Sequence, residues 1–184
     1  MRKEFKPNSW LFPMPVLIIG TYDENDKPNA MSAAWGGMYD YNQVIIALSS
    51  HKTTDNFKVH HAFTLSFATK KTVAASDYVG IVSQKQEPNK IKKAGLTPIM
   101  SEKVHAPLFK EYPLTLECKI VEFNEEKGFV IGNIVSVSVD EEYIKDGKVD
   151  TEKLEALAFD PINHKYRLVG EAVADAFKVG FELK

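Results

Sequence analysis

This chain of 184 residues contains a single cysteine, no long apolar run and no large excess of either charge. Its single cysteine, Cys118, excludes a disulfide within the chain and is typical of the reducing cytoplasm. No apolar stretch approaches the roughly 20 residues that a membrane helix needs. The charges nearly balance, with 23 basic and 25 acidic side chains, so nothing indicates binding to nucleic acid. We therefore expect a cytoplasmic protein that binds neither a membrane nor a nucleic acid.

Recognisable catalytic and metal-binding motifs are missing as well. The five histidines are scattered, and none falls into an HExxH motif or a Cys/His zinc spacing, so the sequence predicts no metal site. No GxSxG segment offers a nucleophilic serine, and no glycine-rich dinucleotide signature is present. Cys118 lies inside the apolar run LTLECKIVEF, which indicates a core thiol and not a nucleophile.

Strand-like runs dominate the chain. Segments 15–22, 30–38, 43–49, 62–69, 114–123 and 128–140 read as strands, mostly joined by turn residues. Helices are expected only as short pieces, near 55–61, at 73–82 and 88–94, and from Thr151 onward, while 100–112 reads as a loop. The long helices that a parallel sheet would need between its strands are lacking. We predict one mainly β domain over residues 1–184, folded as a barrel with short helices.

One polar stretch stands out, because hydroxyl groups surround a histidine and a lysine just before a predicted helix. A phosphate would be held well by such hydroxyls, a lysine and the unpaired N–H groups of a helix start. The alternative is that a threonine merely caps the helix while the lysine points into water. The residues concerned are Ser49, Ser50, His51, Lys52, Thr53 and Thr54.

A modest basic cluster, Lys85 with Lys90, Lys92 and Lys93, follows in the middle of the chain. We interpret it as the solvated face of a short helix. The alternative is that it attracts an anionic cosubstrate such as NAD(P)H.

Taken together in their order, several segments resemble the flavin reductase-like family. They are NAMSAAW, SSHKTTDNF, FTLSFAT, DYVGIVS, HAPLFKEYPLTLECKIVEF and HKYRLVGEAV, and they span nearly the whole chain. The resemblance implies an FMN-binding split β-barrel of Greek-key type, in which two subunits form a homodimer and the flavin lies at their interface.

The resemblance also implies particular residues around the flavin. Asn29, Ala30, Met31, Ser32 and Ala33 match the segment that passes along the flavin ring, and Trp35 holds its aromatic position. Residues 49–54 match the phosphate loop, with Lys52 and Thr54 where the family often has Arg and then Thr or Ser. His164, Tyr166 and Arg167 match the C-terminal segment that approaches the flavin or its nicotinamide side.

The sequence therefore predicts an oxidoreductase in which FMN exchanges hydride or electrons between NAD(P)H and flavin or a further acceptor. The flavin performs the chemistry in such a protein, so no acid–base pair is required. Two alternatives stay open. One is a flavoredoxin-like carrier that exchanges electrons with a redox partner protein and does not use NAD(P)H. The other is a split-barrel binding module without redox chemistry.

Overall fold

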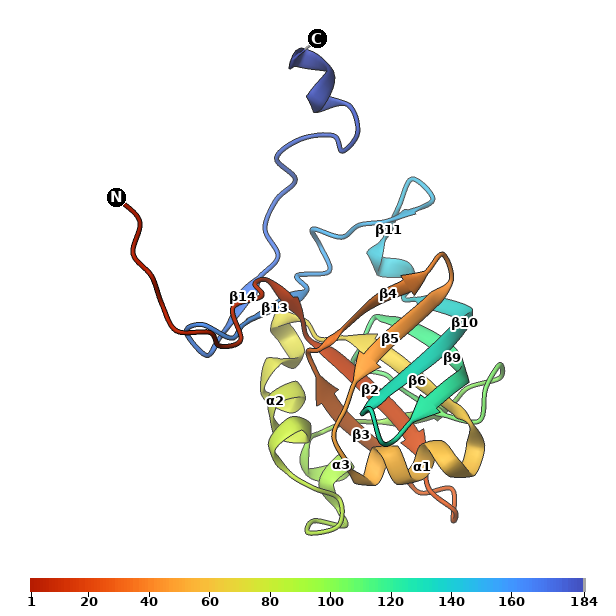
Figure 1. Ribbon diagram of the computed structural model, residues 1–184. Coiled ribbons are helices and arrows are strands. Elements are labelled where there is room, and N and C mark those ends of the chain that lie inside the picture. The colour runs from red at the N-terminus through yellow and green to blue at the C-terminus, as the bar shows by residue number, and fades with distance from the viewer. Residues whose placement is uncertain (184) are drawn as a thin grey trace.

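A curled, fully antiparallel sheet of seven strands forms the body of the molecule (Figure 1), and the computed structural model describes residues 1–183. The strand order is β3-β2-β6-β9-β10-β5-β4, and every neighbouring pair is antiparallel. The prediction of a mainly β split barrel is confirmed. The strands are β2 (Leu17–Tyr22), β3 (Pro28–Ala33), β4 (Gly36–Asp40), β5 (Gln43–Ala47), β6 (Ala62–Phe67), β9 (Leu114–Asn124) and β10 (Phe129–Val139).

The run predicted as one strand over 30–38 is two strands. The chain leaves the sheet at Ala34 and Trp35, and β4 starts at Gly36 on the opposite edge of the sheet from β3. This break opens the split in the barrel, because β3 and β4 are consecutive in sequence yet do not pair. Small residues around Trp35 offer no bulky side chain that would resist such a bend.

The helices are short, as expected. They are α1 (Lys52–His60), α2 (Val73–Ile81) and α3 (Lys90–Lys93), with 3-10 turns η1 (Lys70–Thr72), η2 (Glu141–Tyr143) and η3 (Val179–Leu183). The helices predicted near 55–61, 73–82 and 88–94 are confirmed, although α1 begins three residues earlier than its sequence indicated. None of the helices in the described part of the chain is long and apolar enough to cross a membrane.

The helix predicted from Thr151 is wrong. Residues 151–155 form turns, and Leu157–Asp160 is a strand, β13, which pairs with β1 (Met14–Pro15) and β14 (Lys165–Leu168). Tertiary pairing between distant segments outweighs local helix propensity here. The expected loop at 100–112 likewise contains β8 (Pro107–Phe109), paired with β7 (Pro98–Met100). The turn at Asp146 and Gly147 joins β11 (Ile144–Lys145) to β12 (Lys148–Val149).

Apolar side chains cover both faces of β2, which has six buried residues in a row. Leu17 and Ile19 point into a cluster inside the curled sheet, together with Phe57, Phe63 and Cys118. Ile18 points the other way, into a second cluster with Ala30 of β3 and Val79 of α2. Because α2 closes over β3 in this way, the edge of the sheet becomes one wall of a groove.

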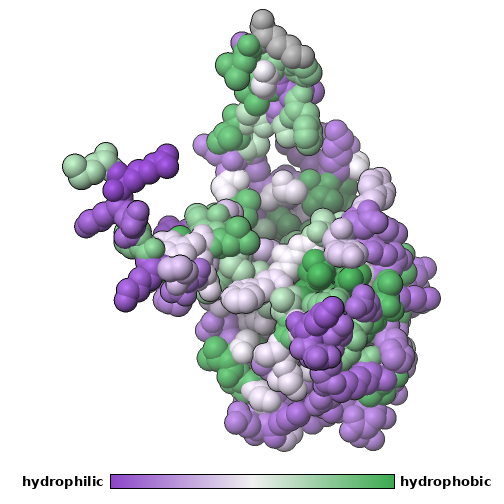
Figure 2. Space-filling model, in the orientation of Figure 1, coloured by the Kyte–Doolittle hydropathy of each residue, from purple (hydrophilic) through white to green (hydrophobic). Residues whose placement is uncertain are grey.

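Both ends of the chain leave the body as arms, one carrying the N-terminus and one η3 (Figures 1 and 2). Large apolar side chains on these arms are almost fully exposed, among them Phe5 at 69%, Val173 at 95% and Phe177 at 97%. Such exposure is unusual for a surface that stays in water and indicates a surface that something else covers.

Candidate functional site

A groove runs along the second half of β3, between the start of α1 and the end of α2. It consists of two connected hollows of about 210 and 490 Å³, which share Met31, Ser32 and His51 in their walls. Together they fall within the range of about 300–1,000 Å³ that holds small ligands. Of the predicted residues, the structure brings Asn29, Met31, Ser32, Ala33, Trp35, Ser49, His51, Lys52 and Thr53 to this groove.

Unsatisfied polar atoms mark the narrow end of the groove. The Nδ2 of Asn29 donates a hydrogen bond to Thr53 Oγ1 at 2.8 Å, and both residues are buried. Within residues 1–183, the other amide atom, Asn29 Oδ1, has no partner, and neither has Oε1 of the buried Gln84, which lines the same hollow. Buried acceptors of this kind cost about 1–3 kcal/mol each unless a donor reaches them. A ligand that carries hydroxyl or N–H groups would supply those donors.

Lys90 is the most unusual side chain in the groove. It is only 3% exposed, and within residues 1–183 its ammonium has no hydrogen-bond or ion-pair partner. Burial lowers the pKa of Lys90 to about 8, because the buried side chain is less well solvated by water when it is charged. The interpretation of Lys90 as part of a solvated helix face is therefore wrong, while Lys92 and Lys93 are exposed as expected. A buried cation without a counter-charge favours an anionic ligand.

Helix α1 begins with a cap, which settles one of the alternatives for the hydroxyl-rich loop. The backbone N–H of His51 donates to Thr54 Oγ1 at 2.9 Å, and that hydroxyl donates to His51 O at 2.8 Å. Thr54 is thus buried in the cap and does not line the groove. Thr53 is its neighbour on the groove side. The helix cap therefore uses Thr54 and leaves Thr53 at the groove, so the cap does not exclude an anion site there.

Lys52 has partners outside the groove, although it also lines the groove. Its Nζ lies 3.3 Å from Glu24 Oε2 and 3.9 Å from Asp23 Oδ2, both on the turn between β2 and β3. The assignment of Lys52 to a phosphate therefore stays a prediction. Lys52 has two carboxylates near its ammonium, whereas within residues 1–183 Lys90 has none.

Small side chains and one tryptophan line much of the wider end of the groove. Ala33, Trp35, Ala47 and Gly128 form its walls, and Ser49 Oγ lies 2.9 Å from His51 Nε2. Helix α2 approaches β3 so closely that a Cβ built on Gly80 would lie 2.9 Å from the Cβ of Ser32. Real Cβ atoms essentially never come so close, so glycine is required at position 80. A planar ring fits such a slot better than a bulky ligand.

Tyr166 of β14, near the C-terminal end of the chain, also lies close to the end of β3. It lines a further hollow of about 210 Å³ together with Ser32, Ala33 and Ala34. Its hydroxyl donates to Asp77 Oδ1 at 2.7 Å, and burial together with this carboxylate raises the pKa of Tyr166 to about 12. The side chain is therefore a fixed, neutral phenol near neutral pH.

Several residues predicted from the resemblance lie elsewhere. Ala30 is fully buried in the core cluster with Val79, because its side chain points to the opposite face of β3 from Met31. Ser50 and His164 are exposed and line none of these hollows. Arg167 donates from Nε to Asp160 Oδ2 at 2.8 Å, which ties it to the turn after β13.

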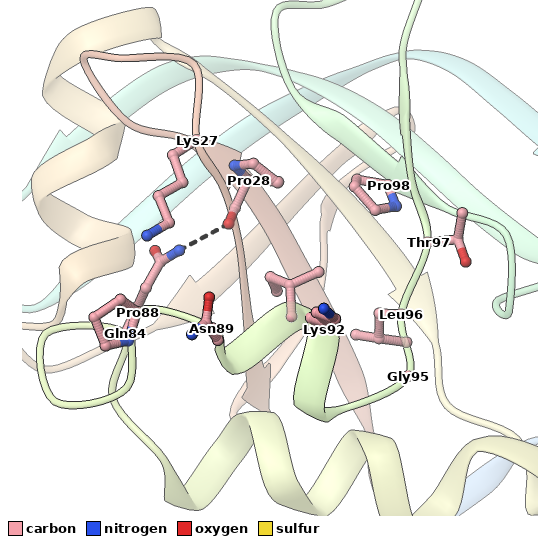
Figure 3. Close-up of a pocket in the computed structure, with 11 residues that line it drawn as sticks. Lys27, Pro28, Gln84, Pro88, Asn89, Lys92, Gly95, Leu96, Thr97 and Pro98 are labelled. Carbon is pink, nitrogen blue, oxygen red and sulfur yellow. Dashed lines mark hydrogen bonds between the residues drawn. The ribbon is translucent and has the colours of Figure 1, made fainter.

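Gln84 connects the narrow end to another hollow of about 470 Å³ (Figure 3). Figure 3 shows its amide donating to Pro28 O, a bond of 2.9 Å. Lys27 and Lys92 belong to the same wall. Of the predicted basic cluster, Lys85 pairs with Asp55 at 2.9 Å and Lys93 pairs with Glu87. Lys92 is thus the member that remains for an anionic cosubstrate at this hollow.

Comparisons with known proteins agree with this architecture. A model of the flavin reductase-like domain matches residues 9–158. The flavoredoxin of Desulfovibrio vulgaris (Miyazaki F) superimposes with a TM-score of 0.93 at 34% identity, over 98% of this chain and 100% of that one. The flavoredoxin of Methanosarcina acetivorans gives 0.87 at 29% identity, over the full length of both chains. An uncharacterised protein of Archaeoglobus fulgidus is 29% identical over 146 residues, which cover 77% of this chain and 80% of that protein. The chain therefore belongs to the flavin reductase-like family.

Proposed function

We propose that the protein binds FMN in the groove along β3. Lys90, Lys52 and Thr53 would hold the phosphate at the narrow end, with Asn29 and Gln84 facing the polar chain of the cofactor. Met31, Ser32, Ala33 and Trp35 would lie along the ring at the wider end, together with Ser49 and His51.

The observation that carries this proposal is the buried side chain of Lys90, whose ammonium has no partner within residues 1–183, in the same hollow as Asn29, whose Oδ1 is unsatisfied within those residues. A free carboxylate or inorganic phosphate would neutralise the charge but would bring few donors for the two amide oxygens. FMN offers a phosphate dianion, a chain of hydroxyl groups and a flat ring in one molecule. It matches the charge, the acceptors and the slot at once.

The activity that we propose is transfer of hydride or electrons between NAD(P)H and a further acceptor, which can be free flavin. Bound FMN would supply this redox chemistry. The chain's own contribution is to hold the ring beside an open face, because Trp35 and Ser49 at the rim are exposed. Cys118 takes no part, since burial raises the pKa of its thiol to about 12.

A second candidate function is that of an electron carrier between proteins, without use of NAD(P)H. The similarity to two flavoredoxins over almost the whole chain favours this candidate. A redox partner protein would then take the place of NAD(P)H at the open face of the groove.

Two measurements test these proposals. The absorbance spectrum of the purified protein, followed by chromatography of what heat releases, is expected to show flavin bands and FMN. A colourless protein that also fails to bind added FMN would contradict the cofactor assignment and favour a binding module. Steady-state oxidation of NADH and NADPH then separates the two functions, because a carrier shows no useful turnover with either.

We also propose that two copies form a homodimer. A large apolar hollow of about 960 Å³ lies between the N-terminal arm and the edge of the sheet, lined by Trp10, Leu11, Trp35 and Ile45. It adjoins the flavin groove, because Trp35 belongs to both. Exposed apolar side chains continue from it over β4 and β10, namely Met38, Tyr39, Val135 and Val137.

Sedimentation equilibrium is expected to give twice the mass of the 20.7 kDa chain. Val137→Glu, which places a charge in the middle of this apolar surface, is expected to shift the protein to the monomer. Lys145→Glu serves as a control, because Lys145 lies at the exposed turn between β11 and β12. A wild-type protein that sediments as a monomer would contradict the proposed dimer.

A further inference from the structure

Three side chains that are far apart in the sequence meet on the surface outside the flavin groove. Asp26 lies on the turn between β2 and β3, His60 in the last turn of α1, and His105 in the loop before β8. Their ligand atoms all lie within 4.8 Å of one another. Imidazole nitrogens and a carboxylate oxygen are the donors that zinc-like ions take from proteins.

The geometry directs both rings at the same oxygen. His105 Nε2 lies 2.7 Å from Asp26 Oδ1, and His60 Nε2 lies 3.7 Å from that atom. The two imidazoles are stacked, with centroids 4.1 Å apart and planes inclined by 28°. Because the ligand atoms of the three residues lie within 4.8 Å of one another, a single ion can contact both rings after a small movement.

Neighbouring residues hold the three side chains in place. Asp26 has a left-handed backbone with φ of 56°, which the turn fixes through hydrogen bonds from Asp26 N to Asp23 O and from Asp23 N to Lys27 O. Tyr22 packs its buried ring edge-on against His105, with centroids 5.4 Å apart. His60 Nε2 lies 3.0 Å from Asp23 O. The fold therefore fixes the backbone that carries Asp26 and restrains both imidazole rings.

We propose that Asp26, His60 and His105 bind a divalent transition-metal ion, with Zn²⁺ as the best-suited member of the class. Calcium and magnesium prefer a shell of oxygen atoms, which two imidazoles do not provide. Three protein ligands leave a fourth tetrahedral position for water or for the carbonyl of Asp23. The ion binds the lone pair of each Nε2, so the proton of each neutral ring then lies on Nδ1.

The position of this site indicates a structural role. Residues 52 and 60 are separated by about 12 Å along α1, at 1.5 Å per residue. A metal ion at the His60 end would tie together the β2–β3 turn, the end of α1 and the loop that leads into β8. It would thus stabilise the fold at the end of α1 that faces away from the flavin groove.

Calorimetric titration of the EDTA-treated protein with ZnCl₂ tests the proposal. The wild type is expected to bind one Zn²⁺ per chain, and His60→Gln and His105→Gln are each expected to bind it at least tenfold more weakly. His61→Asn is the matched control, because His61 is exposed, adjacent to His60 and in a left-handed conformation that asparagine tolerates. Equal Zn²⁺ affinity in all four proteins would overturn the proposal.

A second measurement locates the ion without relying on a histidine variant that folds well. Addition of a substoichiometric amount of paramagnetic Cu²⁺ is expected to broaden the NMR signals of residues 22–27, 60–61 and 104–106 first. Asp26→Asn, which keeps the shape of the side chain, is expected to weaken Zn²⁺ binding as well. Broadening centred on other histidines, or on none, would mean that the cluster is only a hydrogen-bonded group.

Discussion

Replacing Lys90 with methionine is expected to weaken FMN binding by about two orders of magnitude. A hydrogen bond to a charged group contributes about 1.5–3 kcal/mol, and each 1.4 kcal/mol corresponds to a factor of ten. The upper part of that range applies because Lys90 is buried and has no competing partner in the described chain. Methionine preserves most of the volume without the charge, so the variant is expected to fold. Fluorescence titration of the FMN-free protein with FMN measures the change.

The same side chain predicts a dependence on pH. Lys90 has a pKa of about 8 in the free protein, and a bound phosphate dianion raises that pKa. FMN affinity is therefore expected to be constant from about pH 7 to 8 and to fall by up to tenfold per unit above pH 8. The second ionisation of the phosphate, near pH 6, does not interfere in this range. Lys90→Met is expected to show no such decline.

The FMN-free protein offers an independent measurement of the same group. An unfolded lysine has a pKa near 10.5, so between about pH 8 and 10.5 the unfolded chain binds more protons than the folded one. The contribution of Lys90 to the free energy of unfolding then rises with pH across this window. Lys90→Met removes this group's contribution to the rise.

Lys92→Met is the control for both experiments, because Lys92 lies in the same short helix but is exposed. It is expected to leave FMN affinity within about a factor of two, as surface charges usually contribute less than 1 kcal/mol. Equal affinity in Lys90→Met and Lys92→Met would show that the Lys90 ammonium does not hold the phosphate. Lys52 would then be the next candidate, despite its pairing with Glu24.

The sequence alone could not show that Lys90 is buried. A run of lysines around Ile91 looks like a solvated helix face, and local pattern alone cannot show which of them the fold buries. Helix α3 places Ile91 in the core cluster beside Val79, and this packing carries Lys90 below the surface. The hydroxyl groups of the loop before α1 are visible in the sequence. Which threonine caps the helix and which one lines the groove depends on the residue at which the helix starts, and the sequence did not show that residue.

The strands, by contrast, were largely predictable, because turn residues and apolar runs mark the β2–β3 and β9–β10 hairpins locally. What could not be predicted is where distant segments meet. The pairing of β13 with β1, which overrides the helix expected from Thr151, is one example. The meeting of His60 with His105 is another, since no metal-binding spacing connects them in sequence.

Replacing Gly20 with alanine is expected to lower the free energy of unfolding by about 3 kcal/mol, the upper part of the range for overpacking a core. Gly20 lies in the middle of β2 and pairs with Ala30 on one side and Thr64 on the other. A Cβ at this position would lie 2.6 Å from the carbonyl oxygen of Pro107 and would also collide with Thr64 Oγ1. One of these atoms is backbone, so no change of rotamer can relieve the contact.

Urea denaturation measures this loss, with Gly37→Ala in β4 as the control because no atom lies within 4 Å of its added Cβ. The control is expected to stay within about 0.5 kcal/mol of the wild type. The hydrogen bond from Thr64 Oγ1 to Pro107 O holds β8 against β6, and a Cβ on Gly20 would collide with both of its atoms. Because the loop bearing His105 leads directly into β8, Gly20→Ala is also expected to weaken Zn²⁺ binding. A loss of stability below about 1 kcal/mol would mean that β8 can move away from β2 at little cost, and the rigid support that we assign to His105 would be contradicted.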